Sequence, residues 1–106
     1  MTPKPPYYAV IFTSVRTDAD EKGYAEAANR MVSLAEKEAG FLGIESVRGK
    51  VGITVSYWKD LASIQQWKNN IAHTEIREKG KALWYKQYVT RICLVERAYN
   101  WEKELK

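Results

Sequence analysis

Apolar and polar residues follow two different periods along the chain. Residues 7–15, 41–47, 52–58 and 88–97 are rich in β-branched and aromatic side chains, which is typical of strands. After the first and the third of these runs, apolar residues recur every three or four positions, which is the spacing of an amphipathic helix. The short, glycine-containing segment between the second and third runs predicts an antiparallel hairpin.

Local signals set the expected ends of three helices. Asp18, with Glu21 three residues later, predicts the start of the first helix, and Gly40 suits a left-handed residue that ends it. Asp60 is the expected cap of the second helix. A third helical stretch is expected over residues 74–85. The apolar side of the second helix consists of Leu61, Ile64, Trp67 and Ile71.

The resulting order, βαββαβ, predicts an α+β protein of the ferredoxin-like class, with a four-stranded antiparallel sheet and helices on one face. The first and last predicted strands are nevertheless apolar on both faces. A second apolar face would not normally stand open to water, so we expect a homodimer in which two copies cover this face around a two-fold axis. Arg91 is expected to pair with Glu45 or Glu96, within or across the dimer, and Cys93 to be buried.

Composition narrows the class of protein. The 106 residues suit a single domain over residues 1–106, with a proline-rich extended arm (1–6) and a polar tail (99–106). The chain has no apolar run of membrane-spanning length and no signal peptide at its start, so we expect no membrane association and a cytoplasmic location. One cysteine and one histidine cannot form a conventional zinc cluster, and no metal is expected.

The net charge of +4 does not predict a nucleic-acid partner, because basic residues are scattered among acidic ones. RNA-recognition domains share the βαββαβ order, and Arg48-Gly49 resembles the start of their motif. Lys50 and Gly52, however, stand where that motif needs stacking aromatic residues.

Residues 56–67, Ser-Tyr-Trp-Lys-Asp-Leu-Ala-Ser-Ile-Gln-Gln-Trp, resemble the central signature of the antibiotic biosynthesis monooxygenase family. In that signature a strand ends in an aromatic-Trp pair, and an acid-capped helix carries a second Trp. Residues 39–45 resemble the family's Pro-Gly-Phe segment with Ala39 in place of Pro, and His73 matches a common family feature. The resemblance covers roughly residues 7–98 and implies a dimeric α/β barrel with a pocket between sheet and helices in each subunit.

The resemblance leaves several activities open, because one fold hosts many functions. The family includes cofactor-independent oxygenases of phenols and quinols, heme-degrading monooxygenases, and proteins without a settled role. The heme-degrading branch uses an Asn on the first strand, a Trp on the helix after the third strand, and a His about three turns further on. Trp67 matches the Trp, but Arg77 stands near the His position and the first strand has no Asn. We therefore expect no cofactor, with heme as an alternative whose key ligand pattern is missing.

Candidate site residues follow from their chemistry and from the resemblance. His73 is the candidate base, or else a helix-terminal surface residue. Trp67 is either a stacking wall for a planar substrate or a core residue. Arg77 could hold a phenolate, a carboxylate or a developing superoxide, or it could be a solvated helix residue. Further candidate substrate contacts are Tyr57, Trp58, Asn70 and Trp84, and strand alternation puts Tyr57 and Trp58 on opposite faces.

The sequence therefore predicts a cofactor-independent monooxygenase that acts on a small planar aromatic of the phenol or quinol type. The alternatives are a non-catalytic or stress-related dimer that binds a hydrophobic small molecule, and a divergent heme-degrading monooxygenase.

Overall fold

The computed structural model of the chain describes residues 3–104, so the first two residues of the predicted arm and the last two of the predicted tail lie outside it. Its elements, in chain order, are β1 (Tyr7–Arg16), α1 (Glu21–Glu36), β2 (Phe41–Arg48), β3 (Gly52–Trp58), α2 (Leu61–Asn69), α3 (Ile71–Lys79), the π-helical turn η1 (Gly80–Trp84) and β4 (Tyr85–Val95).

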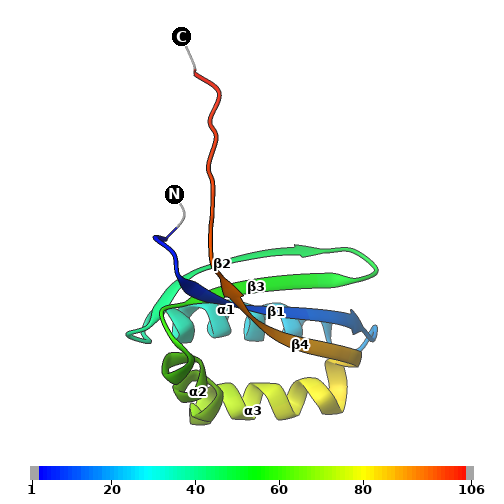
Figure 1. Ribbon diagram of the computed structural model, residues 1–106. Helices are drawn as coiled ribbons and strands as arrows, with labels where there is room; N and C mark the ends of the chain where they lie inside the picture. The colour runs from blue at the N-terminus through cyan, green and yellow to red at the C-terminus, as the bar shows by residue number, and fades with distance from the viewer. Residues whose placement is uncertain (1–2, 105–106) are drawn as a thin grey trace.

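The four strands form one antiparallel sheet in the order β2-β3-β1-β4 (Figure 1). The helices lie on one side of this sheet, and the chain continues beyond β4 as an extended segment that leaves on the other side (Figure 1). This arrangement confirms the predicted ferredoxin-like α+β fold. None of the helices within residues 3–104 is long and apolar enough to cross a membrane.

Strand register assigns each side chain to one of two faces, because neighbours along a strand point to opposite sides. The inner face, which meets the helices, includes Tyr8, Val10, Phe41, Trp58, Ile92 and Leu94. The outer face, on the side without helices, includes Ala9, Ile11, Thr13, Gly43, Glu45, Val47, Ile53, Val55, Tyr57, Val89, Arg91 and Cys93.

The core lies between the inner face and the first two helices. Its buried centre joins Ala35 of α1, Trp58 of β3 and Ile64 of α2. The partly buried side chains of Tyr8, Val10, Phe41 and Trp67 pack around this centre. Trp58 has no exposed surface, and its indole Nε1 donates to Ser56 Oγ at 2.9 Å, so its polar atom is satisfied within the core.

The first helix begins later than predicted, and Asp18 is not its cap. Thr17 is tied to the end of η1, since its backbone N donates to Trp84 O at 2.8 Å and its Oγ1 to Leu83 O at 2.6 Å. The chain therefore turns into α1 two residues further on. Asp20 is the N-cap, with a left-handed φ of 50°, and its Oδ1 accepts from Gly23 N at 3.1 Å.

Gly40 does not end α1 in a left-handed conformation. The helix ends at Glu36 with Lys37 as a right-handed C-cap, and no glycine within residues 3–104 has a positive φ. Gly40 is needed for space instead, because a Cβ at this position would overlap the side chain of Ser63 in α2.

The third helix starts three residues earlier than predicted, and β4 also starts three residues earlier. The predicted Asp60 cap of α2 is present, but α2 ends at Asn69. Asn70, with ψ near 126°, breaks the helix, and its Oδ1 then accepts from His73 N at 3.1 Å as the N-cap of α3. The π-helical turn η1 ends the helical stretch at Trp84.

One prediction about the outer face is wrong for the single chain, and a second is wrong only for pairing within one subunit. Cys93 is exposed, not buried. Arg91 has no carboxylate within 4.0 Å in the part of the chain that the structure describes, so its pairing with Glu45 or Glu96 does not occur within one subunit. Both residues were expected to be covered, and both are exposed within residues 3–104.

The contact at Gly40 gives a stability test. Gly40→Ala should lower the free energy of unfolding by about 1–3 kcal/mol, because the added methyl must displace the buried Ser63. Gly49→Ala is the matched control, since its added Cβ would meet nothing closer than Val51 O at 4.0 Å. Urea unfolding followed by circular dichroism measures both, and equal effects would contradict the close packing of α2 on Gly40.

Candidate functional site

Three aromatic rings from three elements stack on the helix side of the sheet. Trp58 at the end of β3 stacks on Trp67 of α2, with ring centroids 5.8 Å apart and planes 29° from parallel. Trp67 in turn stacks on His73 of α3 at 4.2 Å and 16°. The buried Trp58 thus anchors a column that ends in the only histidine of the chain.

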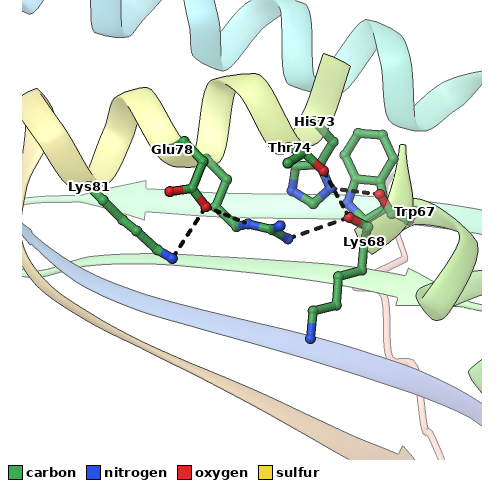
Figure 2. A network of polar contacts seen from close by, with 7 residues as sticks. Trp67, Lys68, His73, Thr74, Glu78 and Lys81 are labelled. Carbon is green, nitrogen blue, oxygen red and sulfur yellow. Dashed lines mark hydrogen bonds and ion pairs between the residues drawn. The ribbon is translucent and has the colours of Figure 1, made fainter. Parts of the chain in front are cut away.

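The imidazole of His73 is fixed at one nitrogen. Its Nδ1 lies 2.8 Å from Trp67 O, and a carbonyl oxygen only accepts, so Nδ1 carries the hydrogen. In the neutral ring, Nε2 then holds a free lone pair and can accept a proton. The same contact fixes the ring plane against Trp67 (Figure 2).

Burial lowers the pKa of His73 below its ordinary value of 6.5, and the positive charge of Arg77 lowers it further. The hydrogen bond to Trp67 O and the negative charge of Glu38 act in the opposite direction, but burial is the largest effect. At neutral pH the side chain is therefore an uncharged imidazole.

Asn70 holds this histidine in place through the backbone. Its Oδ1 caps α3 at His73 N, and its Nδ2 donates to Glu38 Oε1 just after α1, at 3.3 Å. Asn70 therefore links the ends of three helices around the imidazole. Glu38 was not recognised from the sequence, because only the folded chain brings the end of α1 to the α2–α3 junction.

Carbonyl oxygens at the end of α2 accept hydrogen bonds from side chains of α3. Besides His73, Thr74 Oγ1 donates to Lys68 O at 3.3 Å, and Arg77 Nη1 donates to the same oxygen at 3.4 Å (Figure 2). The Arg77 side chain also lies 4.0 Å from Glu78 and is 28% exposed. These contacts satisfy carbonyl groups that a helix C-terminus leaves unpaired.

This arrangement does not fit the heme-degrading pattern. The position near the expected axial histidine is Arg77, whose guanidinium stays protonated and donates to a carbonyl, so it cannot ligate iron. No group of three or more His, Cys, Asp and Glu side chains within residues 3–104 could hold a metal ion.

Two of the predicted site residues lie away from the His73 column. Tyr57 is on the outer face, where its hydroxyl donates to Glu45 Oε1 at 2.6 Å, and this bond raises its pKa to about 12. Trp84 is buried at the end of η1, edge-on to Tyr24 of α1. The structure thus brings together Trp58, Trp67, Asn70, His73 and Arg77, but not Tyr57 or Trp84.

The inner face of β4 offers an uncovered apolar wall. Leu94 shares a row with Tyr8 and Trp58 across the sheet, and Ile92 lies two residues away on the same side. They remain 49% and 53% exposed, because the helices leave this edge strand partly open. Strand alternation marks both as inner-face residues, but sequence alone does not show that the helices leave them uncovered.

Comparisons with known proteins place this geometry in a family. The chain matches the antibiotic biosynthesis monooxygenase family over residues 6–79. It is 52% identical over 99 residues to the uncharacterized protein YqjZ of Bacillus subtilis (strain 168), a match that covers 91% of this chain and 85% of that protein.

Solved structures show the same fold at low sequence identity. A variant of SnoaB, a cofactor-independent oxygenase from Streptomyces nogalater, has a TM-score of 0.76 at 8% identity, covering 89% of this chain and 97% of that one. A putative antibiotic biosynthesis monooxygenase from Nitrosomonas europaea has a TM-score of 0.75 at 10% identity, covering 90% and 95%. With its ferredoxin-like sheet and a family match over most of its length, the chain belongs to the antibiotic biosynthesis monooxygenase family.

Proposed function

We propose that this protein is a cofactor-independent monooxygenase that acts on a small planar phenol or quinol. The observation that carries the proposal is the neutral, oriented imidazole of His73, stacked on Trp67 at the end of the aromatic column. The oxygenase named among the structural neighbours supports an oxygenase activity without a cofactor.

The chemistry requires a base and molecular oxygen. Nε2 of His73 accepts the proton of the substrate hydroxyl, and the electron-rich anion passes one electron to O2. The resulting substrate radical and superoxide then combine to form the new carbon–oxygen bond of a peroxide. The peroxide takes the proton back from His73, and its O–O bond breaks with loss of water to leave the oxidised product. The positive charge of Arg77, which lowers the pKa of His73, would stabilise the anion and the superoxide.

The substrate would lie flat against apolar surface. Trp58 and His73 cover the two faces of Trp67 in the column, so the flat surface comes from the exposed Leu94 and Ile92 on the inner face of β4, and the column borders it. The Asn70 cap holds the start of α3, and with it His73, at a fixed position beside this wall.

A second candidate function is a non-catalytic dimer that binds a hydrophobic small molecule. The contacts at the end of α2 favour it, because they give His73, Thr74 and Arg77 a helix-capping role without any catalysis. This function would keep the apolar wall and would not need Nε2.

The protein acts as a homodimer through its outer face in either case. Val47, Ile53 and Val89 are exposed there by 67%, 39% and 47%, which is apolar surface that a second copy would remove from water. The family resemblance, which implies a dimeric α/β barrel, supports this assembly.

Activity of two variants separates the candidate functions. With an anthrone or quinol substrate, His73→Gln should lower turnover by about a hundredfold or more, because glutamine keeps a donor for Trp67 O but removes the base. Its melting temperature should change little. Trp67→Ala should lower both activity and stability, since it removes a ring from the core. Oxygen uptake measures turnover, and full activity of His73→Gln would exclude the base role.

The ionisation of His73 is a further test. The single His Cε1–H signal in the NMR spectrum should titrate with a midpoint below 6.5 in the folded protein. Between that midpoint and 6.5 the unfolded chain binds more protons, so the free energy of unfolding should fall as the pH falls through this window. His73→Gln should lack this pH dependence, and a midpoint at or above 6.5 would contradict the burial of the imidazole.

Sedimentation tests the dimer. Analytical ultracentrifugation at micromolar concentration should give about twice the 12.2 kDa chain mass. A species of one chain mass would contradict the proposal that a second copy covers the apolar outer face.

A further inference from the structure

Two arginines lie together at one end of the sheet, on its inner face. Arg16 is the last residue of β1, and Arg48 is the last residue of β2. The β2–β3 hairpin, the start of α1 and the start of β4 meet at this end (Figure 1). Trp58 pairs with Tyr8 near the other end of β1, eight residues from Arg16, which is roughly 26 Å along the strand. The two arginines are therefore far from the aromatic column and take no part in the proposed mechanism.

The guanidinium group of Arg16 is held in place but has no hydrogen-bond acceptor. Its Cζ lies 3.6 Å from the centre of the Tyr24 ring of α1, which is a cation–π contact. Its Nε and Nη2 are shut off from solvent and have no partner within residues 3–104. These two nitrogens form one edge of the guanidinium, and such an edge binds two oxygens of a carboxylate or phosphate at once. A buried charged donor without an acceptor is costly, so an acceptor from outside the chain would stabilise this arrangement.

Two small residues of neighbouring strands direct Arg48 to the same place. Its Nη2 donates to Oγ of the buried Ser14 in β1 at 2.7 Å. A Cβ at Gly52 of β3 would overlap the Arg48 guanidinium, so the glycine leaves the space in which this side chain lies. The Cζ of Arg48 is 5.6 Å from the centre of the same Tyr24 ring. The fold thus brings two positive charges to one aromatic ring.

No neighbouring phenolate balances these charges. Burial, followed by the hydrogen bond with Tyr24, raises the pKa of Tyr85 at the start of β4. The positive charges of Arg48 and Arg16 act in the opposite direction, but burial is the largest effect. The Tyr85 phenol is therefore uncharged at neutral pH.

A hollow of about 310 Å³ lies beside the two arginines. Besides Arg16 and Arg48, its lining includes Lys50 of the hairpin, and Asp18 and Glu21 at the turn into α1. No carboxylate within residues 3–104 lies within 4.0 Å of any of these three cations. The volume is at the lower end of the range for small-molecule sites, which begins at about 300 Å³.

We propose that this hollow binds a small molecule through an anionic phosphate or carboxylate group, which the guanidinium groups of Arg16 and Arg48 hold between them. Arg16 turns its unpaired Nε–Nη2 edge toward the hollow and makes a two-point contact with the anion. Arg48 is exposed, so it contacts the anion while Ser14 still holds its Nη2. Lys50 adds a third positive charge.

Titration with inorganic phosphate tests the site. Calorimetry of the parent protein at neutral pH and constant ionic strength should give a Kd of about 1 mM or tighter. Arg16→Gln and Arg48→Gln should each weaken binding about tenfold or more, because each removes charged donors to the anion. Arg30→Gln on the exposed side of α1 is the matched control and should bind as the parent does. Sodium benzoate, titrated in the same way, supplies a carboxylate in place of phosphate.

Gly52→Ala separates a positioned pair of arginines from general positive charge. The added methyl displaces the Arg48 guanidinium, while the net charge is unchanged and the backbone at this position has no positive φ. Affinity for the anion should again fall about tenfold or more, since Arg48 loses its place. Circular dichroism checks that each variant is folded, and this variant keeps the test decisive if Arg16→Gln does not fold.

Weaker binding in the Arg16, Arg48 and Gly52 variants, with full binding in Arg30→Gln, supports the site. The tighter of the two anions identifies the group that the hollow accepts. Equal weakening in all four variants would overturn the proposal, because it would show general charge attraction. Absence of saturable binding of either anion up to about 50 mM would also overturn it.

Discussion

The complete burial of Trp58 determines which side chains at the end of β3 point to the inner face and which to the outer face. Its ring is the centre of the core and the base of the column that holds His73. Because neighbouring strand residues point in opposite directions, the same burial directs Tyr57 to the outer face, where it bonds Glu45. One aromatic pair at the end of β3 thus separates the proposed substrate side of the protein from the proposed dimer side.

In the proposed mechanism, one ring of His73 makes both a capping contact and a catalytic contact. Nδ1 donates to Trp67 O in the last turn of α2, which is a structural task, and this contact leaves Nε2 free and oriented. Burial against Trp67 keeps the ring neutral, so the nitrogen that the fold does not use is the one suited to proton transfer. A stability role and a base role are therefore separable by a substitution that preserves only the donor.

The fold was predictable because strand alternation and helical spacing in this sequence agree with each other. The Asp60 cap and the hairpin between β2 and β3 lie in local sequence, and both are present. The ends of α1 and α3 were not predictable, since they depend on long-range contacts: Thr17 bonds the end of η1, and Asn70 bonds Glu38. For the same reason Glu38 was missed as a neighbour of His73, and Tyr57 and Trp84 could not be separated from the column. The residue type alone singled out His73 as the candidate base. Its tautomer could be assigned only from the contact with the Trp67 carbonyl in the folded chain.

Cys93 places an exposed thiol on the face that the proposed dimer would cover. In the single chain its thiol is exposed on the outer face, which is the face proposed to pair with a second copy. An alkyl or glutathione adduct on this sulfur would hold two paired sheets apart. Association would then protect the thiol, and modification of the free subunit would block association. The two processes would compete for one surface, so the lifetime of the separated subunit would set its sensitivity to thiol reagents.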